Sequence, residues 1–172
     1  MKTIKDNDLR LRPIRLPGDL TIALPWYQDE EVLYFSEGEG TPPYDLTTIE
    51  RMYNYLIKIG EVYIIEVNQR ENWIPIGDVT LSKDMLPIVI GHKKFRGKGI
   101  GKRVIQLLIE RAKELNWKQI RVNKIYSYNV ASRKMFEGLG FNKTKMSFDD
   151  KGRKYNSFQL LLDWLCEMLH LK

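Results

Sequence analysis

A glycine-rich turn, Arg-Gly-Lys-Gly-Ile-Gly at positions 96–101, constrains this chain more than any other segment. It follows a short apolar run typical of a strand, residues 86–90, and it opens a segment from about 99 to 115 with apolar residues at helical spacing. Such a turn points several unpaired backbone N–H groups in one direction, where the helix dipole adds about half a positive charge. Glycine also lets a phosphate approach the backbone closely. The turn therefore predicts a binding site for a phosphate-bearing ligand.

Two common phosphate-binding templates do not fit this turn. A P-loop has four residues between its glycines, whereas three separate Gly97 from Gly101, and a dinucleotide-binding turn would need glycine in place of Val104. The turn does match the pattern Arg-x-x-Gly-x-Gly, at Arg96, Gly99 and Gly101. In this it resembles the cofactor turn of the acetyl-CoA-dependent N-acetyltransferases of the GNAT superfamily.

A second segment strengthens this resemblance. It begins at Asn129 and ends at Gly140 and Phe141, and it resembles the superfamily's second cofactor element. Asparagine is a good helix N-cap, and glycine can adopt the left-handed conformation that ends a helix. With both elements in the usual order and separation, the chain is identified as a member of the superfamily. Its N-terminal half, at 11–14 and 26–32, is similar to the branch that includes ribosomal-protein N-terminal acetyltransferases and antibiotic acetyltransferases.

Length and patterning indicate a single acetyltransferase domain, residues 1–172. A chain of 172 residues, 43% of them hydrophobic, can bury the core of one compact α/β domain. The resemblance implies an α/β (α+β) fold with a mixed, mostly antiparallel twisted sheet of six to seven strands, flanked by helices and splayed at the cofactor strand. Periodicity predicts strands at 9–14, 61–67, 74–81, 86–90, 118–125, from 141, and at 155–161. Helices are predicted at 17–27, from Thr47 or Thr48 to 59, at 99–115, from 129, and over 163–171.

Composition excludes several classes of protein. No run approaches the roughly twenty apolar residues of a membrane span, and the first residues form no apolar signal segment, so we expect a cytoplasmic protein without a membrane partner. The single cysteine, Cys166, excludes an internal disulfide, and we expect it to be a small buried or half-buried residue and not a nucleophile. The two histidines, His92 and His170, lie far apart in the sequence, so no metal site is expected.

Positive charge gathers around the glycine turn, in a chain whose formal net charge is +6. One interpretation is attraction of the phosphates of coenzyme A, a second is binding of nucleic acid, and a third is an ordinary solvated surface. The position of the charges at the turn favours the cofactor over nucleic acid. Acidic residues gather instead at 29–31, Glu37 and Glu39, where they either draw an incoming amine or form ordinary surface charge.

The resemblance implies where the cofactor lies. Acetyl-CoA is the expected cosubstrate, and in this fold its pantetheine arm pairs like an added strand with the strand before the turn, while the turn holds the pyrophosphate. Asn129 is expected beside the pantetheine arm, and Arg133 or Lys134 near the 3′-phosphate. The predicted cofactor-binding residues are therefore Ile88, Val89, Ile90, Arg96, Gly97, Lys98, Gly99, Ile100, Gly101, Lys102, Asn129, Arg133 and Lys134.

The same resemblance implies direct transfer of the acetyl group to an amine in a ternary complex, with backbone donors stabilising the oxyanion. A carboxylate usually removes the proton of the amine, directly or through water, and by their order along the chain Asp84 and Asp78 are the candidates. Many relatives carry a tyrosine that protonates the leaving thiolate where this chain has Phe136. Tyr126 and Tyr128 are the candidates to replace it, with packing roles for both and protonation by solvent as the alternatives.

Three functions remain open from the sequence. The favoured one is an N-acetyltransferase that modifies a primary amine of a small molecule or of a protein N-terminus. Because Phe136 cannot donate a proton, a module that binds acyl-CoA without efficient turnover is the alternative. The third is a nucleic-acid-binding protein that uses the basic residues near the turn. The sequence does not identify the amine acceptor, and it leaves a homodimer open.

Overall fold

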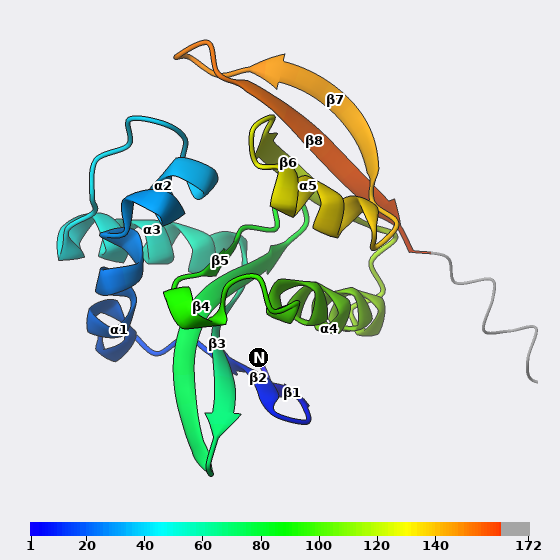
Figure 1. Ribbon diagram of the computed structural model, residues 1–172. Helices are drawn as coiled ribbons and strands as arrows, with labels where there is room; N and C mark the ends of the chain where they lie inside the picture. Colours follow the sequence, from blue (N-terminus) through cyan, green and yellow to red (C-terminus); the bar gives the residue numbers. More distant parts are fainter. Residues whose placement is uncertain (163–172) are drawn as a thin grey trace, which may run out of the picture.

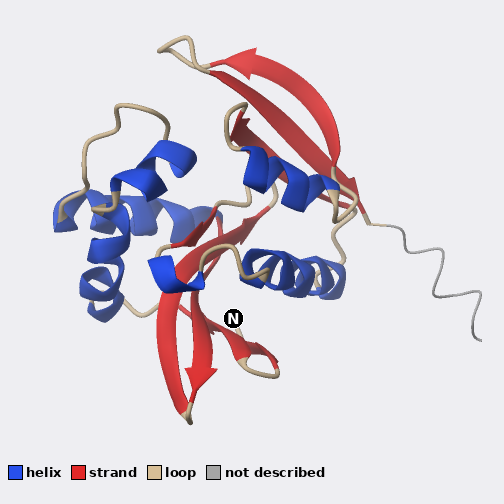
Figure 2. Ribbon diagram, viewed as in Figure 1, coloured by secondary structure: helices blue, strands red, loops and turns tan. Residues whose placement is uncertain are grey.

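The computed structural model describes residues 1–162, which form two antiparallel sheets flanked by helices (Figures 1 and 2). In chain order, the elements of the first sheet and its helices are β1 (Ile4–Asp6), β2 (Leu9–Pro13), α1 (Gly18–Tyr27), α2 (Glu30–Ser36), α3 (Leu46–Ile59), β3 (Gly60–Gln69), β4 (Asn72–Ser82) and β5 (Ile88–Ile90). A 3-10 turn η1 (Lys93–Phe95) then leads to α4 (Ile100–Glu114), β6 (Gln119–Tyr126), α5 (Val130–Glu137), β7 (Asn142–Phe148) and β8 (Lys154–Leu161).

The two sheets separate between β5 and β6. The first sheet has the strand order β1-β2-β3-β4-β5 and the second β6-β8-β7, and all of their strand pairs are antiparallel. Within residues 1–162, no hydrogen-bonded ladder joins β5 to β6. On its other side, β5 pairs with β4 over a short ladder, in which Gly77 lies opposite Ile90 and Val79 lies opposite Ile88. The predicted mixed fold, with a sheet that splays beside the glycine turn, is therefore confirmed.

Helices pack on both faces of the five-stranded sheet (Figure 2). Residues directly opposite each other in paired strands share a face, so Ile64, Asp78 and Val89 all point to one side. Helices α1, α2 and α3 pack on that side. The next residues along, Tyr63 and Val79, point to the opposite side, where α4 packs. The sheet that contains β5 therefore has α1, α2 and α3 on one face and α4, which follows the glycine turn, on the other.

Besides the 3-10 turn η1, one strand and one α-helix were not predicted from the sequence. Strand β1 has three residues and α2 has seven, and both are too short for a hydrophobic period to be read. With β1, the strands number eight within residues 1–162, one more than the upper limit expected. The predicted cap of α3 was wrong: the carboxylate of Asp45 accepts the N–H of Thr48 at 2.8 Å, because an aspartate before the first helical residue can reach that donor.

The predicted closing helix over 163–171, which contains Cys166 and His170, lies outside the described residues. Between residues 1 and 162, no helix has the length and apolar character needed to cross a membrane. The same part of the chain contains no group of three or more His, Cys, Asp or Glu side chains placed to hold a metal ion.

The close approach of β4 and β5 gives a first testable prediction. A Cβ at Gly77 would overlap the carbonyl oxygen of Val89, so Gly77→Ala should push β5 away from β4. We expect a loss of about 1–3 kcal/mol in the free energy of unfolding, measured with urea. Gly18→Ala is the matched control, because a Cβ there meets no atom within 4 Å, and it should change stability by less than about 0.5 kcal/mol. Equal unfolding midpoints for the two variants would contradict this prediction.

Candidate active site

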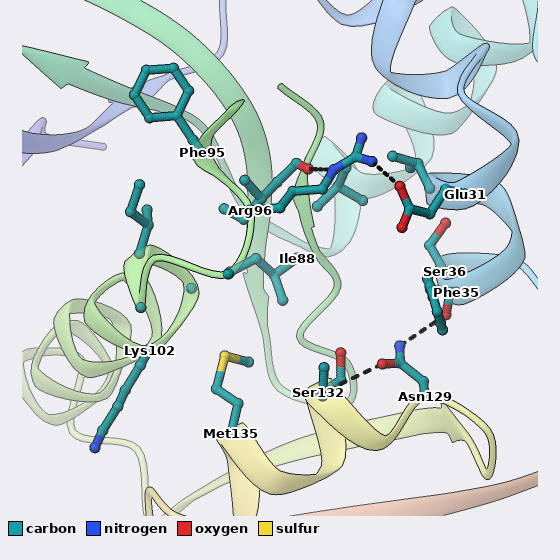
Figure 3. A pocket seen from close by; sticks show the side chains of 18 residues that line it. Glu31, Phe35, Ser36, Ile88, Phe95, Arg96, Lys102, Asn129, Ser132 and Met135 are labelled. Carbon is teal, nitrogen blue, oxygen red and sulfur yellow. Dashed lines mark hydrogen bonds and ion pairs between the residues drawn. The ribbon is translucent and has the colours of Figure 1, made fainter. Parts of the chain in front are cut away.

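A pocket of about 510 Å³ lies beside β5, on the side where β6 has separated from it (Figure 3). Its walls are α2, β5, the glycine turn with the start of α4, and the start of α5. Ten of the thirteen predicted cofactor-binding residues line it, whereas Lys98, Arg133 and Lys134 do not. The lining residues are Glu31, Val32, Phe35, Ser36, Ile88, Val89, Ile90, Phe95, Arg96, Gly97, Gly99, Ile100, Gly101, Lys102, Asn129, Ala131, Ser132 and Met135.

The glycine turn presents backbone donors to this pocket. Gly97 and Gly99 have φ angles of +70° and +75°, in the left-handed region that glycine adopts without strain, and Gly99 is the N-cap of α4. In the described chain, the N–H groups of residues 97–102 donate no hydrogen bond, and the first bonded N–H is that of Arg103, which reaches the carbonyl of Gly99 at 3.3 Å. The side chain of Lys102 extends away from the pocket (Figure 3). The donors that the turn offers to the pocket are therefore main-chain N–H groups.

Arg96 fastens α2 to the end of β5. Its guanidinium donates to the carbonyl of Ile90 at 2.9 Å and to the carboxylate of Glu31 at 2.6 Å (Figure 3). It also donates to the carbonyl of Gly91 at 2.6 Å and to the carboxylate of Asp29 at 2.7 Å. These bonds engage four of its five N–H donors. Arg96 lines the pocket as predicted, but its partners are protein groups at the start of α2, so we assign it a positioning role in place of direct phosphate binding.

Asn129 performs the corresponding task at the other end of α2. Its amide nitrogen donates to the carbonyl of Phe35 at 3.2 Å, and its amide oxygen accepts the N–H of Ser132 at 3.1 Å (Figure 3). The predicted N-cap of α5 is thus present, and the same side chain joins α2 to α5. Both polar ends of Asn129 have protein partners, so its expected contact with the pantetheine arm stays a prediction.

The two tyrosines considered as proton donors contact the last turn of α2 and the residue that follows it. The Tyr126 hydroxyl lies 2.9 Å from the carbonyl oxygen of Glu37 and 3.1 Å from a carboxylate oxygen of Asp149, and its one proton can be donated to either acceptor. The Tyr128 hydroxyl donates to the carbonyl of Tyr34 at 3.0 Å. Their rings stack with centroids 5.3 Å apart. Burial raises the pKa of both phenols, so each holds its proton more firmly than a free tyrosine does. Neither lines the pocket, and the geometry favours their packing roles.

Asp78 is buried behind the pocket, under α1 and α3. Its carboxylate accepts hydrogen bonds from the hydroxyls of Tyr27 at 3.0 Å and Tyr53 at 2.9 Å. Burial raises its pKa to about 7, although the two phenols act in the opposite direction by stabilising the charged form. Asp78 is 3% exposed and does not line the pocket, so a substrate has no direct access to it.

Asp84 is not placed in the site. It lies between β4 and β5, at the end of β5 away from the glycine turn, and its side chain is 83% exposed. Its carboxylate forms an ion pair with Arg121 of β6 at 3.3 Å. Order along the chain suggested Asp84 because it precedes the cofactor strand, but the turn carries its side chain outward into solvent.

Part of the basic charge near the turn is neutralised within the protein. Arg103 forms ion pairs with Asp6 at 3.2 Å and with Asp8 at 2.8 Å, which joins α4 to the β1–β2 turn. Arg133 lies 4.0 Å from Glu137 in the same helix. These pairings reduce the free positive surface that binding of nucleic acid would need.

Sequence reasoning missed α2 as a wall of the pocket. Val32, Phe35 and Ser36 line it from this helix, opposite Ser132 and Met135 of α5. A usable signal was present in the sequence, because an aspartate at position 29 followed by two glutamates is typical of a helix start. The side chain of Asp29 indeed accepts the N–H at position 31, at 2.9 Å.

A family model for the GNAT acetyltransferase domain matches residues 8–142. The chain belongs to the GNAT acetyltransferase family. The matched GNAT domain begins just after β1 and ends at the first residue of β7, so it contains every residue that lines the pocket.

Three further comparisons place this GNAT domain among known proteins. An uncharacterized protein of Methanocaldococcus jannaschii is 29% identical over 159 residues, which are 90% of this chain but only 29% of that protein's length. The spermidine N-acetyltransferase of Vibrio cholerae, solved with CoA and spermine, has a TM-score of 0.73 at 19% identity, covering 91% of this chain and 96% of its own. The ribosomal L7/L12 α-N-protein acetyltransferase RimL, solved with coenzyme A, has a TM-score of 0.76 at 13% identity, covering 94% and 99%. The two solved structures share the fold of this GNAT domain.

The burial of Asp78 predicts a pH dependence of stability. Its pKa is raised from 3.8 to about 7 in the folded protein, so the folded state retains a proton that the unfolded state releases between these values. The free energy of unfolding should therefore fall as pH rises from about 4 to about 7, by up to about 1.4 kcal/mol per pH unit. Asp78→Asn, which stays neutral and can still accept from both phenols, should remove this slope in urea unfolding at a series of pH values. The exposed-site control Asp84→Asn should keep it, and a slope unchanged by Asp78→Asn would contradict the assignment.

Proposed function

We propose that this protein is an acetyl-CoA-dependent N-acetyltransferase that transfers an acetyl group to a primary amine. The observation that carries the proposal is the row of unbonded N–H groups at residues 97–102, which opens onto a pocket beside an unpaired strand edge. A helix start of this kind stabilises phosphate through its donors and its dipole. Membership of the GNAT family makes acetyl transfer the chemistry to which this geometry belongs.

The pocket fits the two chemical halves of coenzyme A. The turn offers donors for the pyrophosphate, and Ile88 and Met135 offer an apolar wall for the pantetheine arm. The edge of β5 that faces away from β4 has no partner strand in the described chain, so residues 88–90 can pair with the amides of an extended ligand as a sheet does with an added strand. A phosphate end and an extended, amide-bearing arm are thus both accommodated.

In this proposal, the residues of the chain bind acetyl-CoA and hold it in a fixed orientation. When bound, acetyl-CoA supplies the acyl group in activated form, as a thioester. The start of α4 balances the phosphate charge, Arg96 holds α2 against β5, and Asn129 holds α2 against α5. Fixing two reactants in a productive geometry can account for about 7–11 kcal/mol of a reaction barrier. A pocket whose walls are held in place by hydrogen bonds can therefore accelerate the reaction by orienting the substrates.

The acceptor is proposed to be a primary amine on the strength of enzymes that share the fold. One of them is named for spermidine and another for the α-nitrogen of a ribosomal protein. These names define two acceptor classes, a small-molecule amine and a protein N-terminus, and the experiments should include both.

An acyl-CoA-binding module without efficient turnover is the second candidate, and one observation favours it. Glu31 is the only carboxylate among the described residues that line the pocket, and it is paired with Arg96 at 2.6 Å. Phe136 is 2% exposed and packs edge-on against Phe141, so it is a core residue that cannot donate a proton. The pocket itself therefore contains no unengaged carboxylate to act as a base.

Calorimetric titration with acetyl-CoA, and with dephospho-CoA for comparison, tests the cofactor proposal. We expect saturable binding at one site, weaker without the 3′-phosphate because basic side chains near the turn lose a charged partner. Release of free thiol in the presence of spermidine, kanamycin or a peptide with an N-terminal serine then separates the enzyme from the binding module. Absence of binding at millimolar acetyl-CoA would contradict both candidates.

The fastening of α2 predicts a difference between two arginines close to the turn. Arg96→Ala removes the hydrogen bonds to α2 and β5, and we expect acetyl-CoA to bind about tenfold more weakly or worse, since a charged hydrogen bond contributes about 1.5–3 kcal/mol. Arg103→Ala is the matched control, because Arg103 also pairs with two carboxylates but lies outside the pocket. Calorimetry should find that Arg103→Ala binds acetyl-CoA with unchanged affinity. Equal losses of affinity in both variants would indicate that the positive charge near the turn matters, and not the position of α2.

A further inference from the structure

Positive charge is divided unevenly between the two sheets. Residues 1–117 contain 17 lysine and arginine side chains and 17 aspartate and glutamate side chains. Residues 118–161, which include β6, α5, β7 and β8, contain ten basic side chains and three acidic ones. The net positive charge of the described chain therefore belongs to the part that contains the second sheet and α5.

Most of this charge has no acidic partner. The three arginines of the segment 118–161 each lie within 4.0 Å of a carboxylate. In contrast, no lysine of this segment forms an ion pair within residues 1–162. These lysines are Lys118, Lys124, Lys134, Lys143, Lys145, Lys151 and Lys154. Uncompensated charges of one sign favour a partner of the opposite sign.

Strand β7 is the open edge of the second sheet. The strand order β6-β8-β7 places it outside β8, and in the described chain no strand pairs with its other edge (Figure 1). Six of its seven residues are exposed and Ser147 is half-buried, so solvent reaches the strand along its whole length. The N–H and C=O groups along such an edge are a template for a further strand.

Lysines lie on both faces of the ribbon that β7 forms with β8. Lys143 lies opposite Phe158, and Lys145 lies opposite Ser157. Because paired residues share a face and successive residues of a strand point to opposite faces, these two lysines lie on opposite faces of the ribbon. Lys154, four residues before Phe158 in β8, lies on the face of Lys143. Each face of the open edge therefore carries positive charge.

We propose that the open edge of β7 binds an extended, acidic segment of a partner polypeptide as an added strand. The main chain of the segment pairs with the N–H and C=O groups of the edge. Its consecutive aspartate or glutamate side chains alternate between the two faces, toward Lys143 and Lys154 on one and Lys145 on the other. No residue of β7 lines the pocket beside β5, so this interaction requires neither acetyl-CoA nor acetyl transfer.

The same features disfavour two other occupants of the edge. Pairing with β7 of a second copy would bring Lys143 and Lys145 of both copies onto one ribbon, where like charges repel. A nucleic acid would be attracted to the lysines, but it lacks the alternating N–H and C=O groups that pair with a strand edge. An acidic polypeptide matches both the charge and the main chain of β7.

Fluorescence anisotropy with the full chain tests the proposal. The probe is a labelled peptide of about eight residues, in which pairs of glutamates are separated by threonines. We expect saturable binding that weakens with salt, and the double variant Lys143→Glu/Lys145→Glu should bind at least about tenfold more weakly. The control Arg51→Glu/Lys58→Glu makes the same change of charge at exposed positions of α3 and should keep the wild-type affinity. Both double variants should keep the wild-type midpoint in urea unfolding, since all four side chains are exposed.

A second probe separates strand addition from simple attraction of charge. The same peptide methylated at every peptide nitrogen keeps its charge but loses its main-chain donors, so it should bind at least about tenfold more weakly. The unmodified peptide should also slow hydrogen exchange of the amides at residues 142–148. Equal binding of the two peptides, unchanged exchange in β7, equal losses in both double variants, or tighter binding of an oligouridylate of the same charge would each overturn the proposal. None of these measurements uses acetyl-CoA, so their outcome is independent of the proposed acetyltransferase function.

Discussion

The absence of a ladder between β5 and β6 in the described chain is the constraint on which the rest of the structure depends. It leaves a strand edge without a partner strand, and a folded protein normally pairs, covers or solvates such an edge. Here the edge borders the pocket, and the glycine turn adds its own unbonded donors directly beyond it. A strand edge without a partner strand and a turn with unbonded N–H groups thus border one pocket.

Helix α2 depends on its contacts for its position, since seven residues are too few to form a stable helix alone. Arg96 holds its first turn, and Asn129 and Tyr128 hold carbonyls of its last turn. Arg96 comes from the glycine turn and Asn129 from the start of α5, which are two different walls of the pocket. The helix is therefore a bridge between the two sheets, and the motif residues Arg96 and Asn129 contribute to this bridge as well as bordering the pocket.

Local rules were enough to predict the glycine turn, the Asn129 cap and the order of the longer strands, because each depends on residues close together in the sequence. The role of Arg96 was out of reach, since its carboxylate partner Asp29 lies 67 positions away. Order along the chain favoured Asp84 and Asp78 equally as bases. Only the folded structure shows that Asp84 lies in a solvent-exposed turn and that Asp78 is enclosed by the hydroxyls of two tyrosines.

The double role of α2 has a thermodynamic consequence. Four residues of α2 line the pocket proposed for acetyl-CoA, and an acceptor that contacts this helix would share it with the cofactor. If a ligand in the pocket favours one arrangement of this helix, it changes the affinity of the acceptor site by some factor. Reciprocity then requires that the acceptor change the affinity of the pocket by the same factor. Two substrates that meet across one short helix are thus linked in their binding free energies, without any movement of the sheets.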